Sequence, residues 1–110
     1  MPSEKQKMIS GERYSPGDPE LVQDRMRAQR LMRDYNSTIY GESDERNRIL
    51  GELLGSIGES CALRAPVFVD YGYNVYIEDE VFLNYGCVLL DICPIRIGSK
   101  TQIGPGVHPR

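Results

Sequence analysis

A six-residue repeat in the second half of the chain is the feature that most limits its fold. Aliphatic residues recur six positions apart, shift by two positions, and then continue the same spacing: Ile77, Leu83, Leu89, Ile95, then Ile97 and Ile103. A period of six fits neither the 3.6-residue turn of an α-helix nor the alternation of a half-buried strand. It is typical of a parallel β-helix, in which three hexads close a coil of about eighteen residues. The repeat predicts one buried column that contains Ile77, Leu83, Leu89, Ile97 and Ile103.

The first part of the chain, residues 1–60, is predicted to be helical. After a short helix over 4–9, Asp18 and Pro19 form a typical helix start, because an aspartate caps the first turn and proline is tolerated there. Two amphipathic helices are expected, the second starting at Ser43. Their apolar faces are Leu21, Ala28, Met32, Tyr35 and Ile39, then Ile49, Leu50, Leu53, Leu54 and Ile57. We interpret this segment as a cap over the open end of the β-helix, whose first coils are predicted over 61–110.

Composition narrows the range of partners. A net charge of −3 and a pI near 5.1 argue against nucleic acid or an anionic membrane as the main partner. No apolar run approaches the ~20 residues of a membrane-spanning helix. An odd number of cysteines without a CxxC pair favours reduced thiols and a cytoplasmic protein. Cys87 and Cys93 are interpreted as packing residues, and the three acids at 78–80 as a solvated turn rather than a metal site.

Four segments resemble the maltose and galactoside O-acetyltransferases, a family of hexapeptide-repeat enzymes that acetylate sugars. The segments cover residues 70–75, 82–85, 89–98 and 104–108. Parallel crossovers are right-handed in most folds, so a left-handed coil is expected only because the resemblance implies it. The resemblance also implies acetyl-CoA as co-substrate, a sugar as acceptor, no metal, and a homotrimer with active sites between subunits. A zinc-bearing β-helix needs three histidines, and this chain has one.

Acetyl transfer to a sugar needs a base for the hydroxyl proton and donors for the tetrahedral oxyanion. The resemblance places the acceptor beside Asn84, with Asp91 one hexad further on and Asp70 as an additional polar contact. Asn84 is equally well interpreted as a corner asparagine in left-handed conformation. The remaining candidates are Phe82 and Tyr85 as flanking walls and Asp18, whose capping role already explains it.

The single histidine, His108, is the candidate base, and two alignments are open. By its distance from Gly104 it matches an earlier histidine of the family pattern, which we favour; by its neighbour Pro109 it matches the catalytic His-Pro pair. The chain stops at Arg110, where such enzymes are about half complete, so no residues for CoA binding are assigned. We expect the chain alone to be inactive and poorly stable. The alternative is a non-catalytic truncated product or an oligomerisation subunit.

Overall fold

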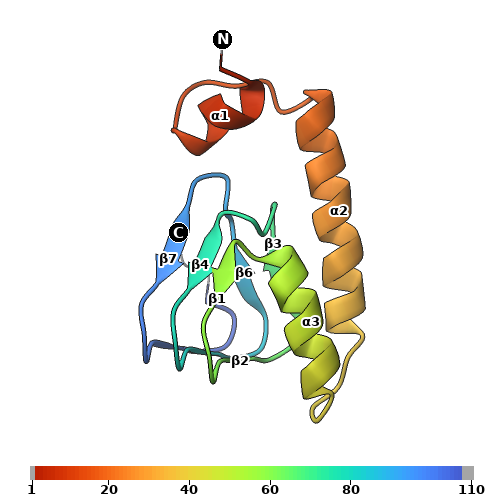
Figure 1. Cartoon of the computed structure of the whole chain (residues 1–110), viewed down its shortest axis with the longest axis vertical. Helices are drawn as coiled ribbons and strands as arrows, with labels where there is room; N and C mark the ends of the chain where they lie inside the picture. Colours follow the sequence, from red (N-terminus) through yellow and green to blue (C-terminus); the bar gives the residue numbers. More distant parts are fainter. Residues whose placement is uncertain (1, 108–110) are drawn as a thin grey trace.

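The computed structural model describes residues 2–107. Helices come first in the chain, and short strands then wind into a coil beside them (Figure 1). The helices are α1 (Glu4–Ile9), α2 (Pro19–Asn36) and α3 (Ser43–Leu53). The strands are β1 (Ser56–Ile57), β2 (Ala62–Leu63), β3 (Val67–Val69), β4 (Val75–Ile77), β5 (Phe82–Leu83), β6 (Cys87–Leu89), β7 (Ile95–Ile97) and β8 (Gln102–Ile103). A helical segment followed by coils of a parallel β-helix is the predicted order, although β1 already lies ahead of the predicted boundary at 61.

The strands form three parallel sheets, and each sheet is one face of the coil. Their strand orders are β1-β4-β7, β2-β5-β8 and β3-β6. Ser56 pairs with Tyr76, Ala62 with Phe82 and Val75 with Ile95, so each coil contains 20 residues. The predicted coil of about eighteen residues was therefore too short.

The two additional residues lie in the same corner of each coil. Within a coil, the inward-facing residue of each face lies six positions after that of the preceding face. The step from the third face to the first face of the next coil is eight residues and passes through 70–74 or 90–94. The two-residue shift of the repeat before Ile97 therefore reflects a longer turn, and this turn recurs in each coil. The prediction of a single buried column was wrong, because three faces give three columns. These are Ile57, Ile77 and Ile97; Leu63, Leu83 and Ile103; Val69 and Leu89.

The corner between the first and second faces also repeats every coil. Ser60, Glu80 and Lys100 all adopt a left-handed backbone, with φ of 58°, 59° and 66°. The acids at 78–80 are exposed, as predicted for a solvated turn. Asp79 accepts a hydrogen bond from the Glu59 N–H of the preceding coil at 2.8 Å. The turn therefore links adjacent coils as well as facing solvent.

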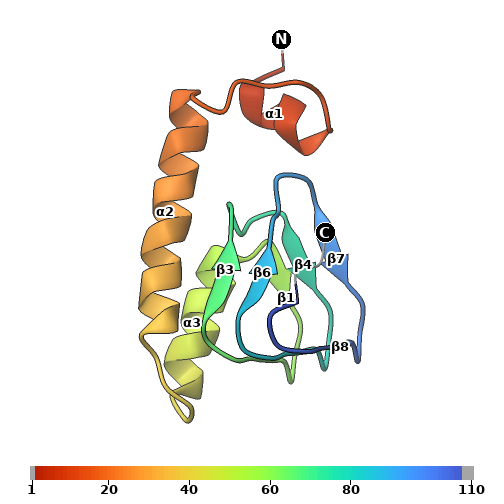
Figure 2. The same ribbon diagram turned by 180° about the vertical axis from the view of Figure 1, so that it is seen from behind.

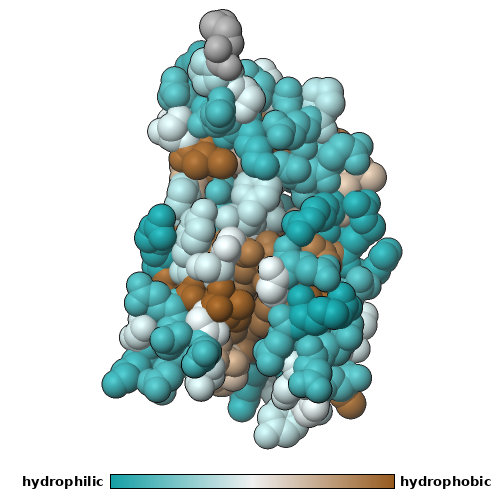
Figure 3. All heavy atoms as spheres, viewed as in Figure 1, coloured by the Kyte–Doolittle hydropathy of each residue, from teal (hydrophilic) through white to brown (hydrophobic). Residues whose placement is uncertain are grey.

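Helices α2 and α3 lie against the first coil, with α2 beside β3 and α3 beside β1 (Figures 1 and 2). The Tyr35 hydroxyl donates to the Leu63 carbonyl, and the Asn36 side chain bonds both the N–H and the carbonyl of Val67. Two predicted members of the apolar faces lie elsewhere. Ile39 follows the end of α2 and is 68% exposed, and Ile57 belongs to β1 rather than α3. Apolar surface gathers where α3 meets the neighbouring strands, and hydrophilic surface covers most of the rest of this face (Figure 3).

The cysteines differ in environment. Cys87 is fully buried in β6, which confirms its interpretation as a packing residue. Cys93 is exposed in the long turn, so the same interpretation was wrong there. The longer turn shifts Cys93 out of the hexad frame. None of the helices in the described part of the chain is both long enough and apolar enough to cross a membrane.

Candidate functional site

The candidate residues divide between two corners of the coil. Asp70 and Asp91 lie in the long turns after β3 and β6, whereas Phe82, Asn84 and Tyr85 lie in and just after β5. Asn84 precedes β6 and Asp91 follows it, so the two groups stand at opposite ends of one strand. The structure therefore does not bring all the predicted acceptor residues together within one copy of the chain.

Asp91 organises the long corner from inside. Its side chain has 0% exposure, and its carboxylate accepts three backbone N–H groups of the preceding coil. Asp70 and Tyr71 donate to Oδ1 at 3.0 and 2.9 Å, and Asn74 donates to Oδ2 at 3.1 Å. The Asn74 side chain forms reciprocal hydrogen bonds, since its Nδ2 donates to the carbonyls of Asp91 and Ile92 at 2.9 and 3.2 Å. Asp91 therefore supports the turn that carries Asp70, and its contact with a sugar stays a prediction.

Asp70 is half-buried at the surface of this turn. Burial raises the pKa of its carboxyl, and the nearby Arg25 guanidinium opposes that rise. Arg25 donates to the Tyr71 hydroxyl and to the Pro16 carbonyl, both at 2.8 Å, and so joins the corner to the turn before α2. Arg25 is not among the candidate residues predicted from the sequence. Its contact with residue 71 depends on how α2 packs against the coil.

Asp18 acts as the helix cap that the sequence predicts. Its Oδ2 accepts the backbone N–H groups of Glu20 and Leu21 at 3.1 and 3.4 Å. These bonds account for its position at the start of α2. Contact of Asp18 with a sugar stays a prediction.

The second corner combines one amide with two aromatic rings and one guanidinium. The Asn84 Oδ1 accepts the Tyr85 N–H at 2.8 Å, and no acceptor for its Nδ2 is present among residues 2–107. Asn84 is not left-handed; the left-handed residue of this turn is Gly86, with φ of 74°. Arg64 lies one coil earlier, with Cζ 5.2 Å from the Phe82 ring centroid and 4.9 Å from that of Tyr85.

Arg64 was missed as a candidate, although a signal for it exists. With a coil of 20 residues, position 64 falls directly beside position 84, and the Arg64 N–H donates to the Leu83 carbonyl at 2.9 Å. An eighteen-residue coil hides this neighbour. The candidate base, His108, lies outside the described residues.

The carboxyls of half-buried Asp70 and buried Asp91 allow a test of the electrostatics of the long corner. Burial raises the pKa of Asp91, against the backbone N–H groups that lower it, and burial also raises the pKa of Asp70. Because the folded-state pKa lies above the unfolded one, these groups favour folding most below their ordinary pKa, near 4, and this contribution is lost as pH rises through the folded-state value.

We expect carboxyl-carbon NMR titration to place the midpoints of Asp70 and Asp91 above that ordinary value. Glu45 serves as a comparison, since its hydrogen bond from Arg48 lowers its pKa. A midpoint for Asp91 below the ordinary range would show that its backbone donors outweigh burial.

Comparison with known proteins agrees with this architecture. Residues 7–58 match the maltose acetyltransferase hexapeptide capping motif. A maltose O-acetyltransferase from Clostridium difficile 630 superposes with a TM-score of 0.94 at 37% identity, over 97% of this chain and 57% of that chain. The chain is similar to the hexapeptide-repeat acetyltransferases over nearly its whole length. A family member from Vibrio cholerae O1 biovar eltor, solved in complex with acetyl coenzyme A, gives a TM-score of 0.89 at 32% identity, over 97% of this chain and 57% of that one.

Sequence relatives extend the family to nodulation proteins. Nodulation protein L of Rhizobium leguminosarum bv. viciae is 42% identical over 107 residues, which are 96% of this chain and 56% of the relative. The chain thus spans little more than half the length of the relatives it matches.

Proposed function

We propose that this chain supplies acceptor-binding residues of an acetyl-CoA-dependent sugar O-acetyltransferase. The observation that carries the proposal is the corner after β5, where an amide whose Nδ2 has no acceptor among residues 2–107 lies beside two aromatic rings. A few polar groups set among apolar walls are typical of small-molecule sites. Acetyl-CoA as co-substrate is supported by the Vibrio cholerae relative solved in complex with it.

In the proposed reaction a sugar hydroxyl oxygen attacks the thioester carbonyl. The new C–O bond forms, the hydroxyl proton passes to a base, and the C–S bond breaks to release the thiol of coenzyme A. Asn84 is suited to hold the acceptor or the oxyanion, because within residues 2–107 its Nδ2 has no acceptor while its Oδ1 accepts the Tyr85 N–H. His108 remains the hypothesis for the base.

The separation of the two corners supports assembly as a homotrimer. A neighbouring copy placed against β6 would bring its own Asn84 corner towards Asp70 and the turn that Asp91 supports. Each site would then lie between two subunits, as the family resemblance implies. We also infer from that resemblance that the coil is left-handed, and from the odd number of cysteines without a CxxC pair that the protein is cytoplasmic.

Replacing Asn84 tests the proposal in a chimera that joins residues 1–107 to the remainder of the Clostridium difficile enzyme. Asn84→Asp keeps the oxygen that accepts the Tyr85 N–H but removes the donor. We expect it to lower kcat/KM with acetyl-CoA and a sugar panel by about 10²–10³-fold, as losing one oxyanion donor does. Gln102→Ala, an exposed change in the next coil, should leave turnover unchanged.

The unmodified 110-residue chain is the negative control of this assay, because we infer that it has no turnover alone. Full activity of the Asn84→Asp chimera would remove Asn84 from the site. An inactive parent chimera would contradict the proposed function itself. Turnover by the chain alone that is lost on His108→Ala would identify His108 as the base.

A further inference from the structure

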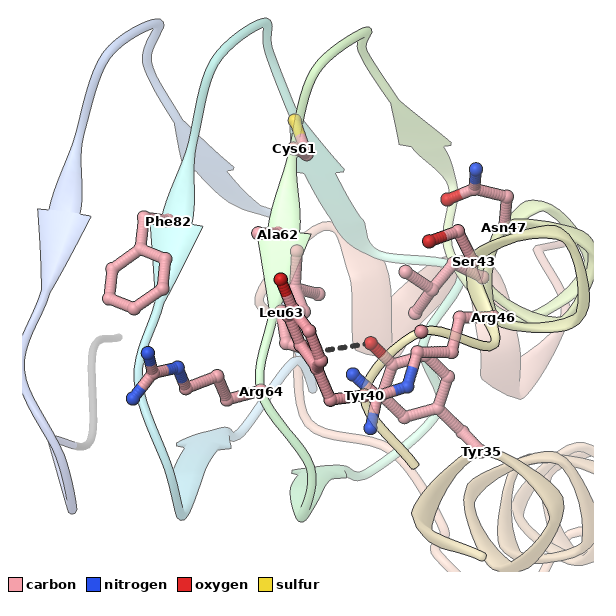
Figure 4. Close-up of a pocket in the computed structure, with 12 residues that line it drawn as sticks. Tyr35, Tyr40, Ser43, Arg46, Asn47, Cys61, Ala62, Leu63, Arg64 and Phe82 are labelled. Atoms are coloured by element: carbon pink, nitrogen blue, oxygen red, sulfur yellow. Dashed lines mark hydrogen bonds between the residues drawn. The ribbon is translucent and has the colours of Figure 1, made fainter. Parts of the chain in front are cut away.

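We propose that the cavity between the α2–α3 loop and the β2–β5 face binds a small planar organic anion, such as an aromatic carboxylate. The cavity has a volume of about 360 Å³, within the range of small-molecule sites (Figure 4). Asn84 is not among its lining residues, and the inference does not rest on acetyl transfer. The lining consists of Tyr35, Tyr40, Gly41, Ser43, Arg46, Asn47, Leu50, Cys61, Ala62, Leu63, Arg64 and Phe82.

The charge of the cavity is positive. Arg46 and Arg64 both line it, whereas none of the lining residues is acidic. Within residues 2–107 neither guanidinium forms an ion pair with a carboxylate, and Glu42, just before α3, uses its Oε1 to accept the Ile39 N–H at 2.7 Å. The Arg64 guanidinium lies against the Phe82 and Tyr85 rings and points away from Arg46 (Figure 4), so Arg46 is the group that would contact the anion.

Hydrogen bonds from part of its guanidinium hold Arg46 in place. Its Nε donates to the Thr38 Oγ1 at 2.7 Å and its Nη2 to the Thr38 carbonyl at 3.3 Å, and its Cζ lies 5.5 Å from the Tyr35 ring centroid. No acceptor for Nη1 is present among the described residues. A guanidinium fixed in this way loses little conformational freedom when it binds a carboxylate.

The N-terminal end of α3 also lies at the cavity. Glu42 occupies the N-cap position of α3 without a side-chain capping bond, and Ser43, the first residue of the helix, lines the cavity. Asp44 and Glu45 also lie in the first turn but do not line the cavity. Unsatisfied N–H groups and the helix dipole both favour negative charge at this end.

The other walls are apolar and aromatic, which selects for an organic anion over an inorganic one. The Tyr35 hydroxyl is already bonded to the Leu63 carbonyl, so this residue offers mainly its ring. Tyr40 is 95% exposed at the cavity, between the coil and the side chains of Arg46 and Tyr35 (Figure 4). Aromatic faces of this kind stack with planar ligands. An aromatic carboxylate would place its ring against these walls and its carboxylate group at Arg46.

Benzoate and its neutral isostere benzamide are the probes, titrated into the ¹⁵N-labelled 110-residue chain and followed by NMR. We expect benzoate to give saturable shifts confined to the amides of 40–47 and 61–64, with a dissociation constant of about 1 mM. Benzamide should bind at least about tenfold more weakly, since the charge-assisted bond is lost. Equal binding of the two probes, or no saturable shift at these amides, would overturn the proposal.

Matched arginine variants on α3 locate the anion. Arg46→Gln should weaken benzoate binding about tenfold or more, whereas Arg48→Gln should not, because Arg48 is exposed and already paired with Glu45 and Glu52. Arg46 also donates hydrogen bonds to Thr38, so Arg46→Lys, which keeps the positive charge, provides a second variant and should bind benzoate more tightly than Arg46→Gln. An Arg48→Gln effect equal to that of Arg46→Gln would contradict a site in this cavity.

Discussion

Asp91→Ala is expected to lower the free energy of unfolding by about 4 kcal/mol. The change leaves the N–H groups of Asp70, Tyr71 and Asn74 without their acceptor inside the protein. Each buried donor without a partner costs about 1–3 kcal/mol, and water entering the small space recovers only part of this. Urea unfolding of the 110-residue chain, followed by circular dichroism, measures the loss.

Two further substitutions distinguish the cost of losing this hydrogen-bond network from the cost of losing a carboxylate alone. Asp91→Asn keeps Oδ1 for two of the N–H groups and should cost about 1–3 kcal/mol, because only the Asn74 N–H loses its acceptor. Asp79→Ala removes an exposed carboxylate that accepts one N–H, and should cost less than about 1 kcal/mol. Equal values for Asp91→Ala and Asp79→Ala would show that Asp91 does not hold the long corner.

Gly72→Ala is the second change with a large expected effect, because the corner packs directly against the end of α3. Gly72 has φ of 88°, and an added Cβ would lie 2.4 Å from the Leu53 carbonyl oxygen and 2.7 Å from its Cδ1. A backbone oxygen at the end of a helix moves only if the helix moves. We expect a loss of more than about 3 kcal/mol in the same unfolding experiment.

Gly86→Ala is the matched control, since it shares the backbone conformation but not the crowding. Gly86 has φ of 74°, and its added Cβ would meet nothing closer than 3.8 Å. It should therefore show only the left-handed penalty of about 1–2 kcal/mol. If Gly72→Ala costs no more than Gly86→Ala, then α3 can shift away from the corner at little expense.

The sequence alone determined the class of fold and much of its local structure. The six-residue spacing of Leu83 and Leu89 predicts short parallel strands, because no helix or flat sheet buries that pattern. Asp18 with Pro19 predicts the start of α2, because a helix cap needs only neighbouring residues. Both predictions depend on contacts that are close along the chain.

The tertiary structure decided which residues meet across coils and between coil and helices. A corner two residues longer than expected sets a coil of 20 residues, and this offset places Arg64 beside Asn84 and turns Cys93 to solvent. The same corner encloses Asp91, whose carboxylate resembles a surface ligand in sequence but accepts three N–H groups inside the protein. Neither result follows from spacing, because the length of a turn and the packing of α2 and α3 against it depend on contacts between residues far apart in the chain.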